Sequence, residues 1–109
     1  PPPPSPTATP EPLLLTPKYP NPSPAKDKVW LPYVLSADAD VNLRIFDISG
    51  ELVLELGSLF EQAGAHERQW DLHNQAGTSV ASGIYLCHIV ATSKHNETDD
   101  AWVKVAVSR

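Results

Sequence analysis

The chain has 109 residues and a formal net charge of −5, with 13 acidic side chains against 8 lysines and arginines. This length allows one small domain with a tail. An acidic chain without a basic stripe argues against binding to nucleic acid or to an anionic membrane surface, and no apolar run is long enough to span a membrane. The single cysteine excludes an internal disulfide.

The composition changes sharply near residue 24, because 11 of the 12 prolines lie at or before that position. We predict that residues 1–18 form a proline-rich linker or docking arm with a largely extended backbone. A glycosylated stalk is the alternative that its serine–proline and threonine–proline pairs leave open. Because the chain begins at a proline, we expect it to be a piece of a longer protein.

One apolar triplet interrupts the arm, and it consists of Leu13, Leu14 and Leu15. Apolar residues are out of place in a solvated spacer. We therefore expect the triplet to add a short strand to the edge of a sheet, and we name its three residues as candidate partner contacts.

Residues 19–109 are predicted to form one all-β domain, because short alternating apolar segments recur with turn residues between them. The expected strands cover residues 29–35, 41–46, 51–56, 66–71, 84–91 and 102–108, which makes about seven with the triplet. Leu52, Leu54 and Leu56 are expected to point inward, and residues 57–65 to form a loop that covers Leu59 and Phe60. Pro32 is expected to place its strand at a sheet edge or at a bulge.

The stretch between residues 70 and 89 organises this domain. Trp70 is large enough to fill the middle of the core. Gly77 and Gly83 supply backbone positions at which a positive φ has no steric cost. Arg68 has the same inward parity as Trp70, and we interpret it as a contact with the arm or with a partner.

An ordered set of short motifs runs through residues 13–109: Tyr19-Pro20-Asn21-Pro22, the segment 41–53, Trp70-Asp71, Gly77, and Ala81-Ser82-Gly83-Ile84-Tyr85. With these motifs the chain resembles the immunoglobulin-like domain of flagellar hook-capping proteins and the C-terminal sorting domain of type IX secretion cargo. The motif positions that we assign a structural role are Asn21, Pro22, Asp47, Gly50, Trp70, Asp71, Gly77, Gly83 and Tyr85. Three residues depart from the family pattern: Ser23 in place of Phe, Leu72 in place of Gly, and Arg68 in place of an apolar residue.

This resemblance implies an immunoglobulin-like antiparallel β-sandwich. It also implies a non-enzymatic bacterial module that is extracellular or at the cell surface, at the C-terminus of a larger secreted protein.

The residue types that bind metals occur here without the spacing of a metal site. The histidines are divided between expected strands and expected loops, at positions 66, 73, 88 and 95. The pairs Asp38/Asp40 and Asp99/Asp100 are more typical of solvated turns than of a calcium site. We predict neither a metal nor a cofactor.

Nucleophiles are equally poorly placed for catalysis. Cys87 lies mid-strand with core parity and has no base to activate it. Ser79 and Ser82 lie in a turn without the pattern of a nucleophile elbow. We therefore predict that the chain is not an enzyme. Asn96-Glu97-Thr98 matches a glycosylation acceptor in an expected hairpin loop, which leaves modification there open.

Three aromatic residues have the parity of the face opposite the core: Trp30, Phe46 and Trp102. Their exposure as one patch would predict a protein-binding surface. The alternative is that the tryptophans pack under the arm.

Two functions stay open after this reading, and both require a protein partner. The first is a sorting or attachment module recognised by secretion or surface-attachment machinery. The second is a subunit of an extracellular filament, in which the proline-rich arm lies on a neighbouring copy.

Overall fold

The structure is a computed structural model that describes residues 12–109. The predictions for residues 1–11 therefore lie outside the described residues. Within residues 12–109 the chain forms seven strands, β1 (Leu15–Pro17), β2 (Val29–Leu35), β3 (Ala39–Asp47), β4 (Leu52–Glu61), β5 (Gly64–Trp70), β6 (Gly83–Thr92) and β7 (Thr98–Val107). No helix occurs in this part of the chain, and so none that could cross a membrane.

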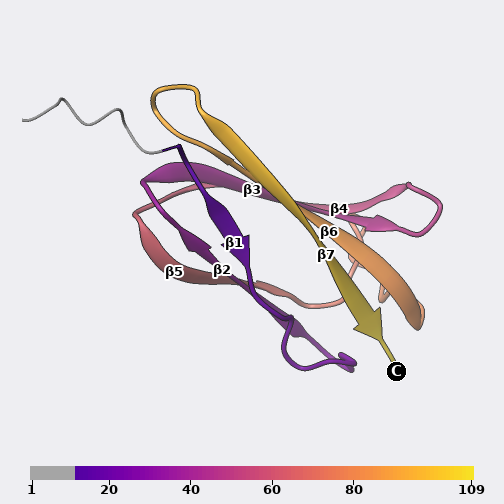
Figure 1. Ribbon diagram of the computed structural model, residues 1–109. Coiled ribbons are helices and arrows are strands. Elements are labelled where there is room, and N and C mark those ends of the chain that lie inside the picture. The colour runs from indigo at the N-terminus through magenta and orange to yellow at the C-terminus, as the bar shows by residue number, and fades with distance from the viewer. Residues whose placement is uncertain (1–11) are drawn as a thin grey trace, which may run out of the picture.

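Two antiparallel sheets pack face to face, with strand orders β1-β2-β5 and β4-β3-β6-β7 (Figure 1). The alternation seen in the sequence decides which side chains lie between them. Along β2, β3 and β6, and in β7 from Val103 onward, buried residues alternate with residues that face outward. This arrangement confirms the expected immunoglobulin-like β-sandwich.

Trp70 occupies the centre of the core and is fully buried. Its ring meets the ring of Tyr85 edge-on, with centroids 5.3 Å apart, and its indole N–H donates to the carbonyl of His73 at 3.0 Å. The hydroxyl of Tyr85 donates back to the carbonyl of Ala81 at 2.7 Å. The predicted core residue is thus confirmed, and its polar atom has a partner, as a buried indole requires.

β1 confirms that the apolar triplet adds a strand to a sheet edge. It pairs with β2, and Leu15 lies opposite Leu35. Leu13 and Leu15 are buried in the core, while Leu14 between them is 56% exposed. On the side away from β2, the N–H groups of Leu13 and Leu15 donate to carboxylates at residues 97 and 99. The folded body therefore includes residues that the sequence assigned to the arm.

β4 is longer than expected and shows that the predicted loop at residues 57–65 is wrong. The strand continues to Glu61, and Leu59 and Phe60 are exposed rather than covered. Its register against β3 shifts between Leu43 and Arg44, where Gly57 adopts a φ of +87°. A bulge of this kind lets a strand continue past a glycine.

A second register shift lies between Ile45 and Phe46 of β3. Because side chains alternate along a strand, one extra residue moves the next side chain to the other face. Leu52 therefore lies opposite Phe46 on the outer face and is 52% exposed, so its predicted inward position is wrong. Leu54 and Leu56 are partly buried against the core.

Pro32 lies in a central strand, so the predicted edge position is wrong. β2 pairs with β1 on one side and with β5 on the other, without a register shift. The carbonyl of Pro32 accepts a hydrogen bond from the N–H of Lys18, one residue past the end of β1. The N and carbonyl of one strand residue point to the same side. The side of Pro32 that lacks an N–H group therefore faces the position where β1 has ended. The hydrogen bonds between β2 and β5 do not need this N–H group.

Candidate functional site

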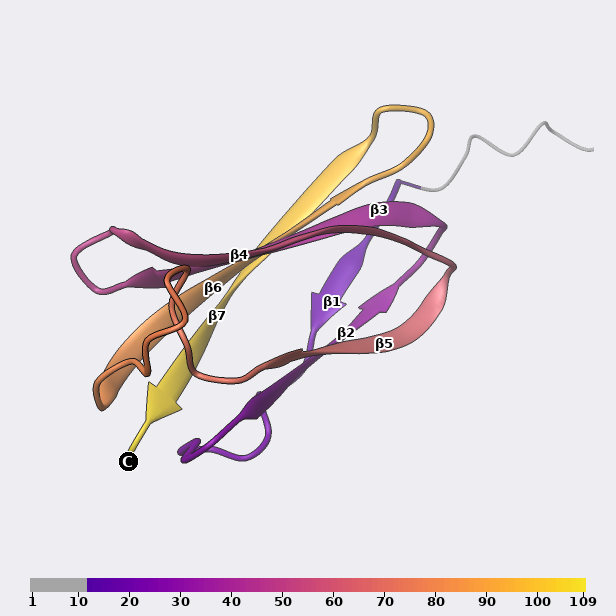
Figure 2. The same ribbon diagram turned by 180° about the vertical axis from the view of Figure 1, so that it is seen from behind.

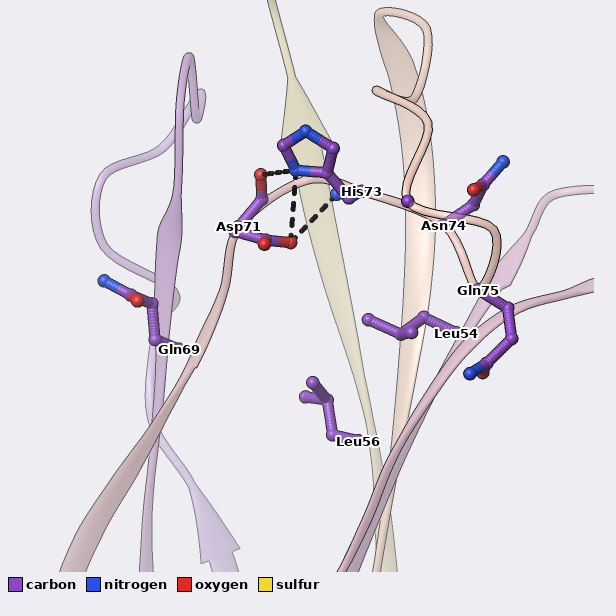
Figure 3. A pocket seen from close by; sticks show the side chains of 8 residues that line it. Leu54, Leu56, Gln69, Asp71, His73, Asn74 and Gln75 are labelled. Carbon is purple, nitrogen blue, oxygen red and sulfur yellow. Dashed lines mark hydrogen bonds and ion pairs between the residues drawn. The ribbon is translucent and has the colours of Figure 1, made fainter.

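A hollow of about 420 Å³ lies between the middle of β4 and the loop that follows β5 (Figure 3). Leu54 and Leu56 of β4 form its apolar wall, and Asp71, His73 and the turn around Asn74 form its polar side. The side-chain oxygen of Asn74 accepts from the N–H groups of two later turn residues, at 3.0 and 2.9 Å. The turn closes at residue 77, a glycine with a φ of +83°, which other residues reach only with strain.

One serine, one histidine and one aspartate lie in a row beside this hollow. The hydroxyl oxygen of Ser79 is 3.4 Å from Nε2 of His73, and Nδ1 of His73 is 3.3 Å from Oδ1 of Asp71. Nδ1 lies closer, at 2.9 Å, to the backbone carbonyl of Asp71. The carboxylate is 67% exposed, whereas the aspartate of a catalytic triad is buried. This row is best explained as a loop-stabilising network.

The other histidines have separate partners. Nδ1 of His66 lies 2.8 Å from one oxygen of Glu61, whose other oxygen accepts from the hydroxyl of Tyr33. Burial and this hydrogen bond raise the pKa of Tyr33 well above its usual range. Nε2 of His88 lies 2.7 Å from Oδ2 of Asp100. Nowhere between residues 12 and 109 do three or more histidine, cysteine or acidic side chains gather as a metal site would require.

Three of the four aspartates considered above for a calcium site have protein partners. Asp99 accepts from the N–H of Leu15 at 2.8 Å, whereas its neighbour Asp100 pairs with His88 on the outer face. Asp38 accepts from the N–H of Ala63 at 2.8 Å. These carboxylates bind protein donors in different directions, which is not the geometry of a shared cation site.

Cys87 is fully buried on β6, in keeping with its core parity. Burial raises the pKa of its thiol to about 12. The thiolate is the reactive form of cysteine, so this side chain is an inert part of the core.

The predicted aromatic patch is divided between the two outer faces of the sandwich. Phe46 and Trp102 meet on the sheet of β3, β6 and β7, with ring centroids 5.6 Å apart. The ring of His88 stacks on Trp102 at 4.1 Å with an angle of 9° between the planes. Trp30 faces outward from β2 on the other sheet. The structure therefore brings together two of the three aromatic residues.

Trp102 also lines a groove of about 480 Å³. This groove lies between the end of β1 and β7. We call it the Tyr19–Trp102 groove, since these two side chains are 94% and 55% exposed within it. The remaining lining residues are Pro17, Lys18, Pro20, Val103 and Lys104. Sequence reasoning did not select Tyr19 as a surface residue. A tyrosine among prolines, outside any alternating segment, is the signal that could have found it.

Several residues with an assigned structural role fix turns and connections. Asn21 exchanges two backbone hydrogen bonds with Trp30, at 3.1 and 2.8 Å, and is followed by Pro22 in an exposed segment. Oδ1 of Asp47 accepts from the hydroxyl and N–H of Ser49 and from the N–H of residue 51, and these bonds lower the pKa of Asp47. Gly50 closes this turn with a φ of +90°.

Two arginines hold the backbone together in ways that sequence reasoning missed. Arg68 reaches between the sheets and donates to the carbonyls of residues 41, 56 and 57, at 3.2, 2.9 and 2.9 Å. Its predicted contact with the arm or a partner is therefore wrong. Arg109 donates from its side chain to the carbonyls of Val80 and Leu72, at 2.7 and 2.9 Å. It thereby fixes the loop between β5 and β6.

Comparison with solved structures shows the same fold in other bacterial proteins. The similar structures include latent dimeric PorU from Porphyromonas gingivalis, with a TM-score of 0.73 and 22% identity over 88% of this chain. They also include FlgD from Xanthomonas campestris, with a TM-score of 0.63 and 20% identity over 86% of this chain and 68% of FlgD. PorZ from P. gingivalis has a TM-score of 0.53 and 23% identity over 84% of this chain.

The chain spans only 9% of the length of PorU and 11% of the length of PorZ. No curated protein that was compared with it gives a significant match. The family model of the FlgD Ig-like domain matches residues 23–95, which is well over half of the chain. The matched region contains β2 to β6, the buried tryptophan and the turns around Asp47 and Asn74. The chain is a member of the FlgD Ig-like domain family.

Proposed function

We propose that the chain is a non-catalytic module that directs the secretion of a larger protein or attaches that protein to the cell surface, through contacts with protein partners. The observation that carries the proposal is the family match, taken together with the fold shared with PorU and PorZ. PorZ is described as a bacterial surface component of the type IX secretion system. By this likeness, we place the module outside the cell or at its surface.

The chemistry of the described residues supports a binding role. The core between the sheets is apolar. His73 stabilises a loop, Arg68 binds backbone carbonyls and Cys87 is part of the core. What remains for recognition is the surface, namely the sheet edges, the loops and the outer aromatic residues. Edge strands and exposed aromatic side chains are common elements of protein recognition.

Deletion of residues 19–109 from the parent protein tests this role in the bacterium that makes it. We expect surface display to be lost while the amount of protein synthesised stays the same, as measured by surface labelling and by immunoblot of whole cells. The matched control carries Ile48→Ala, which changes one exposed side chain outside the candidate contact residues. Normal surface display of the truncated protein would refute the proposal.

A second candidate function is that of a subunit in an extracellular assembly. The fold shared with FlgD, a protein described as capping the flagellar hook, and the exposed Tyr19–Trp102 groove beside the arm favour it. Sedimentation velocity of the 109-residue chain over a wide concentration range tests this candidate. Concentration-dependent association supports it, and a monomer at every concentration counts against it.

A further inference from the structure

We propose that the Tyr19–Trp102 groove is a binding site for a proline-rich segment, and that its occupant is residues 1–12 of a second copy of the chain. The proposal goes beyond the sorting role and names the contact on which the second candidate function would rest. Its first support is the shape of the site. β1 and β7 lie side by side in both views of the fold (Figures 1 and 2). The groove is lined by residues at and after the end of β1 and by residues of β7.

The two exposed aromatic rings give the groove the chemistry that polyproline needs. A polyproline helix has no internal hydrogen bonds and a backbone that is already extended, so it loses little entropy on binding. Domains that recognise such segments hold the proline rings in grooves lined by aromatic side chains. Tyr19 and Trp102 provide this kind of lining from the two sides of the groove.

The ring of Trp102 is held in place although it is exposed, and the backbone that carries Tyr19 is fixed. Trp102 stacks on His88, which is itself fixed by Asp100, and contacts Phe46. The backbone on either side of Tyr19 is fixed by the N–H of residue 18, which donates to Pro32, and by the N–H of residue 21, which donates to Trp30. A preformed site loses less side-chain freedom when a ligand binds.

Charge and composition identify the occupant. Residues 1–12 contain seven prolines and one charged side chain, Glu11. The groove carries Lys18 and Lys104, which makes it locally basic on a chain with a net charge of −5. An acidic, proline-rich segment therefore matches the groove in both backbone shape and charge.

The direction of β1 favours a second copy over the same chain. Leu13 and Leu15 lie against the start of β7, at Glu97 and Asp99, whereas the groove lies further along β7 at residues 102–104. A segment that precedes Leu13 would have to reverse direction at once to reach its own groove. Pro10 and Pro12 oppose this reversal, since each restricts the residue before it to extended backbone.

The test is a titration of the ¹⁵N-labelled 109-residue chain with a synthetic peptide of residues 1–12, followed by NMR at a concentration where the chain is monomeric. Each tryptophan gives its own indole signal, so the signals of Trp30 and Trp70 serve as internal references. We expect a saturable shift of the Trp102 indole signal together with the amide signals of Lys18 and Lys104. A peptide in which alanine replaces every proline should cause no such shift.

Variants separate the groove from the rest of the surface. Trp102→Ala should weaken binding by at least about tenfold, which is the usual effect of losing an aromatic residue at the centre of a site. Trp30→Ala is the matched control on the other sheet and should leave binding unchanged. Should Trp102→Ala lower the thermal midpoint, Lys104→Glu provides a second test. It should weaken binding of the native peptide, and a peptide with Glu11→Lys should restore it.

Three results would overturn the proposal. The first is a Trp102 indole signal that does not move at millimolar peptide, on the order of the weakest specific affinities. The second is equal binding by the Trp102→Ala variant that keeps its fold. The third is saturable peptide binding by a chain that sediments as a monomer at every concentration, which would overturn the second copy as occupant. None of these results bears on the sorting role, which the deletion experiment tests separately.

Discussion

Two arginines show at the level of single residues how surroundings decide what a charged side chain contributes. Arg68 lies on an inward position of β5 and satisfies three backbone carbonyls near the bulged part of β4. Arg44 lies on the outer face of β3, where it pairs with Glu55 at 2.8 Å and stays about half exposed. Water screens the ion pair between Arg44 and Glu55, and it solvates both side chains when the pair is broken.

We predict that Arg68→Met destabilises the domain by about 2–3 kcal/mol, because the partly buried carbonyls lose their donors. Arg44→Met, the matched control, should cost about 0.5 kcal/mol or less. Urea unfolding followed by tryptophan fluorescence measures both. Equal effects of the two substitutions would contradict the structural role of Arg68.

A second prediction at this scale concerns the buried thiol. Burial raises the pKa of the Cys87 thiol to about 12, so very little thiolate forms near neutral pH. We expect Cys87 to resist a thiol reagent such as Ellman's reagent in the native chain and to react at once in urea. Rapid modification of the native chain would show that the thiol is exposed.

At the level of elements, β1 shows how a proline-rich segment becomes part of the fold. Buried and exposed residues alternate along β1 and the residues before it. On the side of β1 away from β2, where a further strand of the sheet would lie, the N–H groups of Leu13 and Leu15 donate to the carboxylates of residues 97 and 99. We predict that Leu15→Ala costs about 2 kcal/mol, at the lower end of the effect of truncating a buried leucine.

Leu14→Ala is the control for this prediction, since the side chain next to Leu15 points to solvent. It should change the free energy of unfolding by less than about 0.5 kcal/mol. Thermal unfolding of both variants measures the difference. If Leu15→Ala were as mild as Leu14→Ala, β1 would not belong to the folded body.

Much of the fold could be predicted from alternation alone. β2, β3, β6 and β7 have one buried and one outer face, so the alternation of apolar residues in the sequence identified these segments as strands. β4 could not be predicted in the same way, because its two bulges change the parity of the side chains. Pro32 is tolerated in a central strand because its missing N–H lies on the side where the short strand β1 has ended.

The candidate site was less predictable than the fold. The alternation of side chains along each strand placed Trp30, Phe46 and Trp102 on outer faces. Alternation does not show which sheet a strand joins, so the sequence could not show that Trp30 lies on a different sheet from the other two. The groove depends on Tyr19 and on residues about 80 positions later, which only the packing of β1 beside β7 brings together. Arg109 was missed because its partners are carbonyls, which leave no pattern in the sequence.

At the level of the whole molecule, the domain combines a satisfied interior with an outer surface of exposed edges and aromatic residues. Trp70 fills the centre of its core, and turn residues together with Arg109 fix its loops. Residues 12–109 thus contain a hydrophobic core of their own. A module of this kind should therefore keep its properties when it is moved to another protein.

Transfer of the module tests the central claim most directly. Residues 1–109 are fused to the C-terminus of an inert reporter that is exported to the periplasm of a bacterium with a type IX secretion system. We predict that the reporter appears at the cell surface or in the medium, whereas a reporter with residues 1–18 alone stays inside. A folded fusion that remains in the periplasm, with the reporter still attached, would contradict the account.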